Sequence, residues 1–136
     1  CAKRSFLMTY SAETSTLFQR VGGMQFFFDL VEKFYDGVET DPILRPLYPE
    51  DLGPGKAHLA LFLGQYWGGP RQYEMERGHP RLRMRHGPFA IHRAERDAWM
   101  SHMTDAVVVS EASPQDKSLL MGYFDSAATF MINREG

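Results

Sequence analysis

One histidine stands in a part of the chain whose neighbours could hold an imidazole ring in a fixed orientation. His86 lies in a short basic segment, with Pro80 before it and Gly87 and Pro88 directly after it. Because proline restricts the backbone on both sides, the ring can be held without belonging to a long helix. No carboxylate or cysteine stands beside it. We therefore expect His86 to suit a single imidazole bond to an iron that the protein does not otherwise ligate.

The segments on either side of this histidine are rich in aromatic side chains. QYWGGP occupies residues 65–70, and ERDAW occupies residues 95–99. Over the whole chain, 13% of the residues are aromatic, with ten Phe, six Tyr and two Trp. Such a content can build a bulky core or a pocket for a flat ligand, and composition alone favours the bulky core.

The composition limits the class of protein. A chain of 136 residues is long enough for one domain that buries a core around a small organic cofactor. A net charge of −2 gives no electrostatic footprint for a nucleic-acid partner. The one cysteine, Cys1, allows no internal disulfide, which fits a cytoplasmic protein. No apolar run approaches the roughly 20 residues that cross a bilayer, so we expect no membrane span.

The spacing of apolar residues predicts an all-α chain with five or six helices. Residues 1–11 have the character of a flexible tail, and residues 12–136 form the expected domain. Four prolines and two glycines in residues 41–55 favour short turns over a long helix. No segment alternates as a half-buried strand would. The predicted helices cover residues 13–21, 24–38, 56–66 and 93–109, with a last helix that Ser113 caps and Pro114 opens.

Five motifs occur along the chain in this order: FYDGV, LYPED, QYWGGP, GHPRLRMRH and ERDAW. Together they resemble the truncated haemoglobins, and specifically the group II bacterial branch, over about residues 17–132. The resemblance implies a shortened globin fold, in which two helix pairs pack two-over-two around haem b, that is, iron protoporphyrin IX. It also implies that His86 is the proximal ligand of the haem iron. Without these motifs, a lone histidine in a loop is better interpreted as a solvent-facing residue.

On the other face of the haem, the resemblance implies three hydrogen-bond donors that point at a bound gas: Tyr35, Tyr48 and Trp99. Iron-bound dioxygen becomes partly anionic, and donors in dry surroundings hold it more strongly than water would. The alternative for each aromatic residue is plain core packing, and a tyrosine in a turn, such as Tyr48, often faces solvent. Gly55 aligns near the usual distal gate, where it would supply no donor and leave a small opening through which a ligand could enter.

The remaining expected haem contacts divide into an apolar wall and a polar edge. The expected wall residues are Leu59, Phe62, Leu63, Tyr66 and Phe89. The expected partners of the haem propionates are Arg85 first, and then His79, Arg83 and His58. We expect His92 and His102 to be ordinary helix residues.

Three functions are compatible with these features. The first is reversible binding of dioxygen, and of nitric oxide and carbon monoxide, at a five-coordinate haem iron. The second is an enzyme on the same scaffold, either a nitric oxide dioxygenase or a peroxidase-like oxidant. The third is a haem-free helical interaction module. Three donors should hold dioxygen tightly, which argues against bulk oxygen transport and for chemistry, sensing or redox use. A reductase partner and a homo-oligomer remain open at this point.

Overall fold

The chain folds into helices joined by short connections, as seen in a computed structural model that describes residues 15–77 and 90–133. Every regular element within these two ranges is helical, and neither range contains a strand. The all-α prediction is therefore confirmed. The expected tail, residues 1–11, and the segment around His86 lie outside the described residues, so the expectations about them stay predictions.

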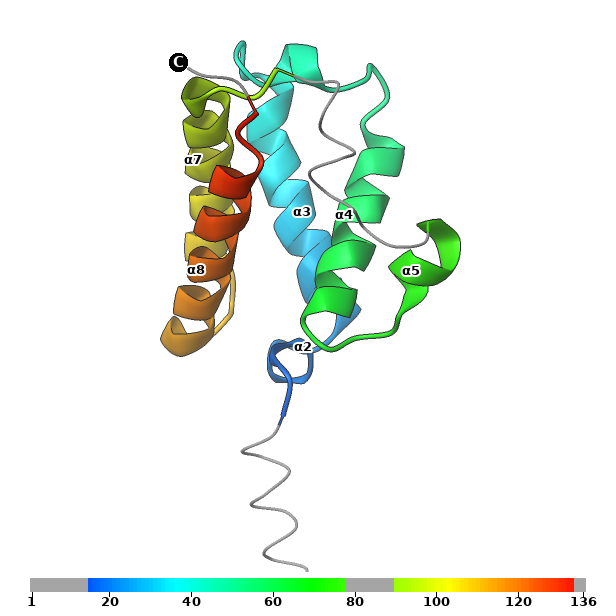
Figure 1. Cartoon of the computed structure of the whole chain (residues 1–136). Coiled ribbons are helices and arrows are strands. Elements are labelled where there is room, and N and C mark those ends of the chain that lie inside the picture. The colour runs from blue at the N-terminus through cyan, green and yellow to red at the C-terminus, as the bar shows by residue number, and fades with distance from the viewer. Residues whose placement is uncertain (1–14, 78–89, 134–136) are drawn as a thin grey trace, which may run out of the picture.

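The four long helices form two pairs. The elements in chain order are α2 (Leu17–Arg20), α3 (Met24–Glu39), the 3-10 helix η1 (Arg45–Leu47), α4 (Gly53–Tyr66), α5 (Gln72–Arg77), α7 (Arg93–Val109) and α8 (Pro114–Phe130). Helix α3 packs on α4, α7 packs on α8, and α3 also contacts α7, which joins the two pairs (Figure 1). The short helix α5 packs against α4. Among the helices of the described ranges, none combines the length and apolarity needed to cross a bilayer.

Helix α3 supplies the centre of the core. Its buried side chains recur at three- and four-residue steps, which gathers them on one side of the helix. Phe27, Phe34 and Val38 have no solvent-accessible surface at all. The other buried side chains of α3 are Leu30, Val31 and Tyr35. Because Tyr35 belongs to this packed face, its ring position is fixed by the core.

Helix α8 begins with the N-terminal signal that the sequence predicts. The hydroxyl of Ser113 accepts a hydrogen bond of 3.1 Å from the backbone N–H of Asp116, and Pro114 occupies the first turn. The Asp116 carboxylate is 4% exposed and lies 2.9 Å from the Arg20 guanidinium of α2. The first turn of α8 therefore also anchors α2, because Asp116 in that turn pairs with Arg20.

Two helix starts differ from the prediction, and one helix was not predicted. The first helix begins at Leu17, later than expected, because the Thr16 hydroxyl caps it by accepting the Gln19 N–H at 3.1 Å. Helix α4 begins at Gly53, three residues earlier than the expected start at residue 56, with Pro54 in its first turn. Helix α5 lies between the predicted helices of residues 56–66 and 93–109, where no helix was predicted.

Candidate ligand pocket

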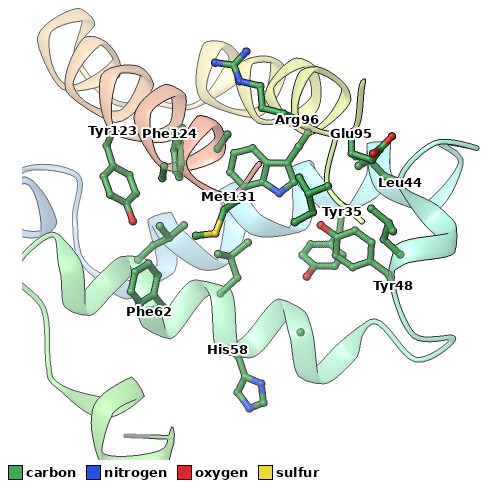
Figure 2. A pocket seen from close by; sticks show the side chains of 18 of the residues that line it. Tyr35, Leu44, Tyr48, His58, Phe62, Glu95, Arg96, Tyr123, Phe124 and Met131 are labelled. Atoms are coloured by element: carbon green, nitrogen blue, oxygen red, sulfur yellow. The ribbon is translucent and has the colours of Figure 1, made fainter. Parts of the chain in front are cut away.

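A cavity of about 480 Å³ lies between the two helix pairs (Figure 2). Its lining is mostly apolar and comes from α3, α4, α5, α7, α8 and the corner between α3 and α4. Small-molecule and cofactor sites usually enclose about 300–1,000 Å³ and carry a few polar groups that orient the ligand. The size and lining of this cavity therefore fit a mainly apolar organic ligand.

Three aromatic side chains with polar groups share the wall of the cavity. Tyr35 comes from α3, Tyr48 from the corner after η1, and Trp99 from α7. The rings of Tyr35 and Tyr48 meet edge to face, with centroids 5.7 Å apart, at one side of the pocket (Figure 2). The indole N–H of Trp99 hydrogen-bonds to the phenol oxygen of Tyr48. Because an indole can only donate, Tyr48 is the acceptor and its own O–H stays available to a further partner.

The surroundings keep both phenols protonated. Burial raises the pKa of Tyr35 to about 12. The pKa of Tyr48 is raised as well, first by burial and then by the nearby Tyr35, while the hydrogen bond from Trp99 lowers it in part. At neutral pH, both O–H groups are therefore intact donors. Donors fixed in a largely apolar cavity stabilise a partial negative charge on a bound ligand.

Packing behind the three side chains fixes their orientation. Phe34 packs against two of them, with its ring centroid 5.0 Å from that of Trp99 and 5.4 Å from that of Tyr35, and the Tyr35 ring in turn contacts Tyr48. Phe124 of α8 contacts Trp99 from another side at 5.8 Å. These separations are typical of tilted and edge-to-face aromatic pairs, which are stabilising beyond their buried area. The polar atoms are thus pre-positioned by an apolar layer.

The corner that carries Tyr48 is held by a network of hydrogen bonds. The guanidinium of Arg45 donates to three successive carbonyl oxygens, those of Tyr48, Pro49 and Glu50, at 3.3, 3.0 and 3.0 Å. At the start of the corner, the Asp41 carboxylate accepts the backbone N–H of Ile43 at 2.7 Å. The backbone around Tyr48 is therefore fixed from both ends.

A contact from α7 reaches the start of the same corner. The Nε2 atom of His102 lies 2.6 Å from Oδ2 of Asp41, although the two residues are far apart in the sequence. His102 follows Trp99 by one helical turn, so one side of α7 contacts both Asp41 and Tyr48. On its other side the imidazole packs against Gly37, where an added Cβ would lie 2.2 Å from Nδ1. His102, expected to be an ordinary helix residue, thus helps to position the corner.

The Asp41–His102 contact should give stability that is lost in acid. The hydrogen bond from His102 is the largest cause that holds the pKa of Asp41 below its ordinary value of 3.8. A carboxyl with a lowered folded-state pKa stabilises the protein above its unfolded-state value, and this contribution disappears as the pH falls through the folded-state pKa. Asp41→Asn should therefore lower the free energy of unfolding by about 1 kcal/mol at pH 7, and by less below pH 3.8.

Urea denaturation of wild type and variant at several pH values between 7 and 3 measures this difference. Asp51→Asn is the matched control, because Asp51 is an exposed carboxylate of the same corner that accepts the Gly53 N–H, at 3.0 Å. A difference between wild type and Asp41→Asn that stayed constant over the whole pH range would show that the charge of Asp41 is not involved.

The structure brings most of the predicted distal residues together and leaves one apart. Tyr35, Tyr48, Trp99, Gly55, Leu59, Phe62 and Leu63 all line the cavity, and so does His58. Tyr66 does not: it lies at the end of α4 and is 53% exposed. His92 is the N-cap of α7 and pairs with Glu95 at 2.7 Å. His79, Arg83, Arg85, His86 and Phe89 lie outside the described residues and stay predictions.

Gly55 lies against the hydroxyl of Tyr35. A Cβ atom added at Gly55 would stand 3.0 Å from the Tyr35 oxygen, closer than an ordinary van der Waals contact. The first turn of α4 can therefore approach Tyr35 only because this position lacks a side chain. On the face of the Tyr35 ring, the Nζ atom of Lys56 lies 5.9 Å from the ring centroid.

Sequence reasoning missed much of the far wall. The structure adds Tyr123, Phe124, Ala127 and Ala128 of α8, and the C-cap residue Met131, to the lining. From other elements it adds Leu44, Leu47, Pro49, Tyr73, Ile91, Glu95 and Arg96. In the sequence, Tyr123, Phe124 and Ala127 belong to one apolar stripe at helical spacing. That signal finds a buried helix face, but it does not distinguish a face that meets other side chains from one that borders a cavity.

Two helix pairs around one largely apolar cavity, with phenol and indole donors on its wall, define a globin-type ligand-binding protein. The chain belongs to the bacterial-like globin family, which matches residues 16–133. The resemblance to the group II truncated haemoglobins and the truncated globin fold are confirmed by this match together with the following relatives.

Relatives of known name and structure agree with this assignment. The chain is 38% identical to the group 2 truncated hemoglobin YjbI of Bacillus subtilis over 112 residues, which cover 82% of this chain and 85% of that protein. It superposes on a hemoglobin of Chloroflexus aurantiacus with a TM-score of 0.86 and 50% identity, over 88% of this chain and 98% of that chain. The group II truncated hemoglobin of Bacillus anthracis gives the same TM-score at 35% identity, over 90% and 99% of the two chains.

Proposed function

We propose that this chain binds haem b in the cavity and holds dioxygen, nitric oxide or carbon monoxide reversibly at a five-coordinate iron. The observation that carries the proposal is the arrangement of Tyr35, Tyr48 and Trp99 on the wall of an apolar cavity in a member of the globin family. The lining suits a flat, mainly apolar macrocycle, and it places intact O–H and N–H donors along one wall. When bound, haem supplies the iron position at which a diatomic gas binds.

Different residues of the chain would bind the iron, the propionates and the gas. The His86 imidazole would hold the iron, and Arg85, with His79, Arg83 and His58, would partner the propionates. Leu59, Phe62 and Leu63 would exclude water from the gas. Tyr35 and Tyr48 would donate to the partly anionic ligand, while Trp99 either donates directly or fixes Tyr48. Such firm holding favours sensing or redox use over bulk oxygen transport.

Titration of the purified protein with haem tests the proposal. The wild type should develop one strong Soret absorption band that saturates at one haem per chain. His86→Ala should weaken or abolish that band, whereas His92→Ala should keep it, since His92 pairs with Glu95. A wild type that takes up no haem would contradict the proposal, and a full Soret band in His86→Ala would contradict the assigned ligand.

Adding a methyl group at Gly55 should disturb ligand retention through Tyr35. In Gly55→Ala the new Cβ would stand 3.0 Å from the Tyr35 oxygen, so the hydroxyl must shift by a few tenths of an ångström. Partial loss of a charge-assisted hydrogen bond should speed dioxygen dissociation about threefold to tenfold. Stopped-flow displacement of dioxygen by carbon monoxide measures this rate.

Gly53→Ala is the matched control for this substitution. It adds a methyl group in the same turn of α4, but its Cβ would meet the Asp51 side chain, at 3.2 Å, instead of Tyr35. Equal dissociation rates in the two alanine variants would mean that the Tyr35 hydroxyl does not contact the gas.

A further inference from the structure

A pair of tyrosines connects the cavity with the protein surface. Tyr123 of α8 lines the cavity and lies on the side of the view opposite to Tyr35 and Tyr48 (Figure 2). Its ring centroid is 4.2 Å from that of Tyr66, and the two rings are inclined by only 33°. Tyr66, at the end of α4, is 53% exposed. The oxidisable ring of Tyr123 on the cavity wall is thus in direct contact with the solvent-exposed ring of Tyr66.

Trp67 completes the packing around this pair. Its ring meets Tyr66 edge to face at 5.1 Å and Tyr123 at 5.7 Å. Three mutually packed aromatic rings hold one another in place, so the 4.2 Å contact between the two phenols is part of a rigid cluster. A close contact between two aromatic rings favours electron exchange between them.

The two phenols differ in how readily each can release its proton when it is oxidised, and this difference gives electron exchange a direction. A phenol that loses an electron must also release its proton, because the oxidised form is strongly acidic. Burial raises the pKa of Tyr123 to about 12, with a further contribution from Tyr66, so the Tyr123 phenol holds its proton more firmly than a free phenol does. Tyr66 is exposed and can release its proton directly to water. The stable site of oxidation in the pair is therefore Tyr66.

We propose that Tyr66 is a surface site of one-electron exchange, where phenolic reductants deliver electrons that pass through Tyr123 to the cavity. This inference rests on the proposed haem binding and takes hydrogen peroxide as the oxidant. Peroxide gains two electrons and two protons and becomes two water molecules. Each of two phenol donors loses one electron to Tyr66 and one proton to water, so the reaction balances. Without a donor, two oxidised Tyr66 side chains join by a carbon–carbon bond between their rings.

Peptide mapping after peroxide treatment tests the route. Wild type, Tyr66→Phe, Tyr123→Phe and Tyr73→Phe would be loaded with haem to equal Soret absorbance, treated with equimolar hydrogen peroxide, digested and examined by mass spectrometry for cross-linked tyrosine. We expect a Tyr66–Tyr66 cross-link in wild type and in Tyr73→Phe, and its loss in Tyr123→Phe, where Tyr66 is still present. Excess hydroquinone should suppress the cross-link in wild type.

Tyr73→Phe is the matched control because Tyr73 also lines the cavity but is 5% exposed and packs edge to face on Phe62. An undiminished Tyr66 cross-link in Tyr123→Phe would overturn the proposal, since it would mean that diffusing oxidants reach Tyr66 from solvent. An unmodified Tyr66 in haem-loaded wild type would overturn this inference alone. A wild type that binds no haem would overturn the proposed function and this inference with it.

Discussion

Dioxygen should leave the Trp99→Phe variant about tenfold to a hundredfold faster than it leaves the wild type, because a hydrogen bond to a charged group contributes about 1.5–3 kcal/mol. The substitution removes the indole N–H that contacts the Tyr48 oxygen. It keeps an aromatic ring between Phe34 and Phe124, which pack on Trp99 at 5.0 and 5.8 Å. The expected acceleration therefore reports on the lost donor more than on lost packing.

Carbon monoxide displacement of bound dioxygen in a stopped-flow instrument gives the dissociation rates. Trp67→Phe is the matched control, because it makes the same change at the other tryptophan, which does not line the cavity. Tyr48→Phe distinguishes the two possible actions of Trp99, which are direct donation of a hydrogen bond to the gas and fixation of the Tyr48 phenol. If Trp99 acts only by fixing Tyr48, then dioxygen should dissociate at the same rate from Tyr48→Phe and from the double variant that combines Tyr48→Phe with Trp99→Phe. An unchanged rate in Trp99→Phe would rule out both actions.

The long helices were predictable from the sequence because each carries its own local signal. The apolar spacing of residues 24–38 matches the buried face of α3, and Ser113 and Pro114 mark the start of α8. Helix α5, Gln72–Arg77, has six residues, too few to show a helical period. Its Tyr73 is buried by packing on Phe62 of α4, a tertiary contact that leaves no trace in the local sequence.

The distal trio could be predicted only through the family resemblance. Tyr35, Tyr48 and Trp99 lie on three separate elements, and no spacing rule brings them together. The Asp41–His102 contact went unrecognised for the same reason, since it joins residues on distant parts of the chain. The α8 wall was missed for a different reason. Core and cavity lining have the same apolar composition, and only the three-dimensional packing shows which side chains leave a space beside them.

Truncation of Phe34 in α3 should produce a large loss of stability. Phe34 has no accessible surface and contacts both Tyr35 and Trp99, so Phe34→Ala removes a whole ring from the layer beneath the polar trio. Replacing a fully buried phenylalanine by alanine costs about 3–5 kcal/mol, through lost burial and the cavity left behind. That is a large share of the roughly 5–15 kcal/mol by which domains are stable.

Phe28→Ala on the same helix is the matched control, because Phe28 is 41% exposed and its truncation should change stability by less than about 1 kcal/mol. Urea unfolding of the haem-loaded proteins at one fixed haem concentration compares the two variants, since bound ligand itself adds to stability. Phe34→Ala should also release dioxygen faster than Phe28→Ala does, because Tyr35 and Trp99 lose the ring that orients them. Equal losses of unfolding free energy in both variants would mean that α3 does not bury the side that carries Phe34. The positions of Tyr35 and Trp99 would then have to be reassigned.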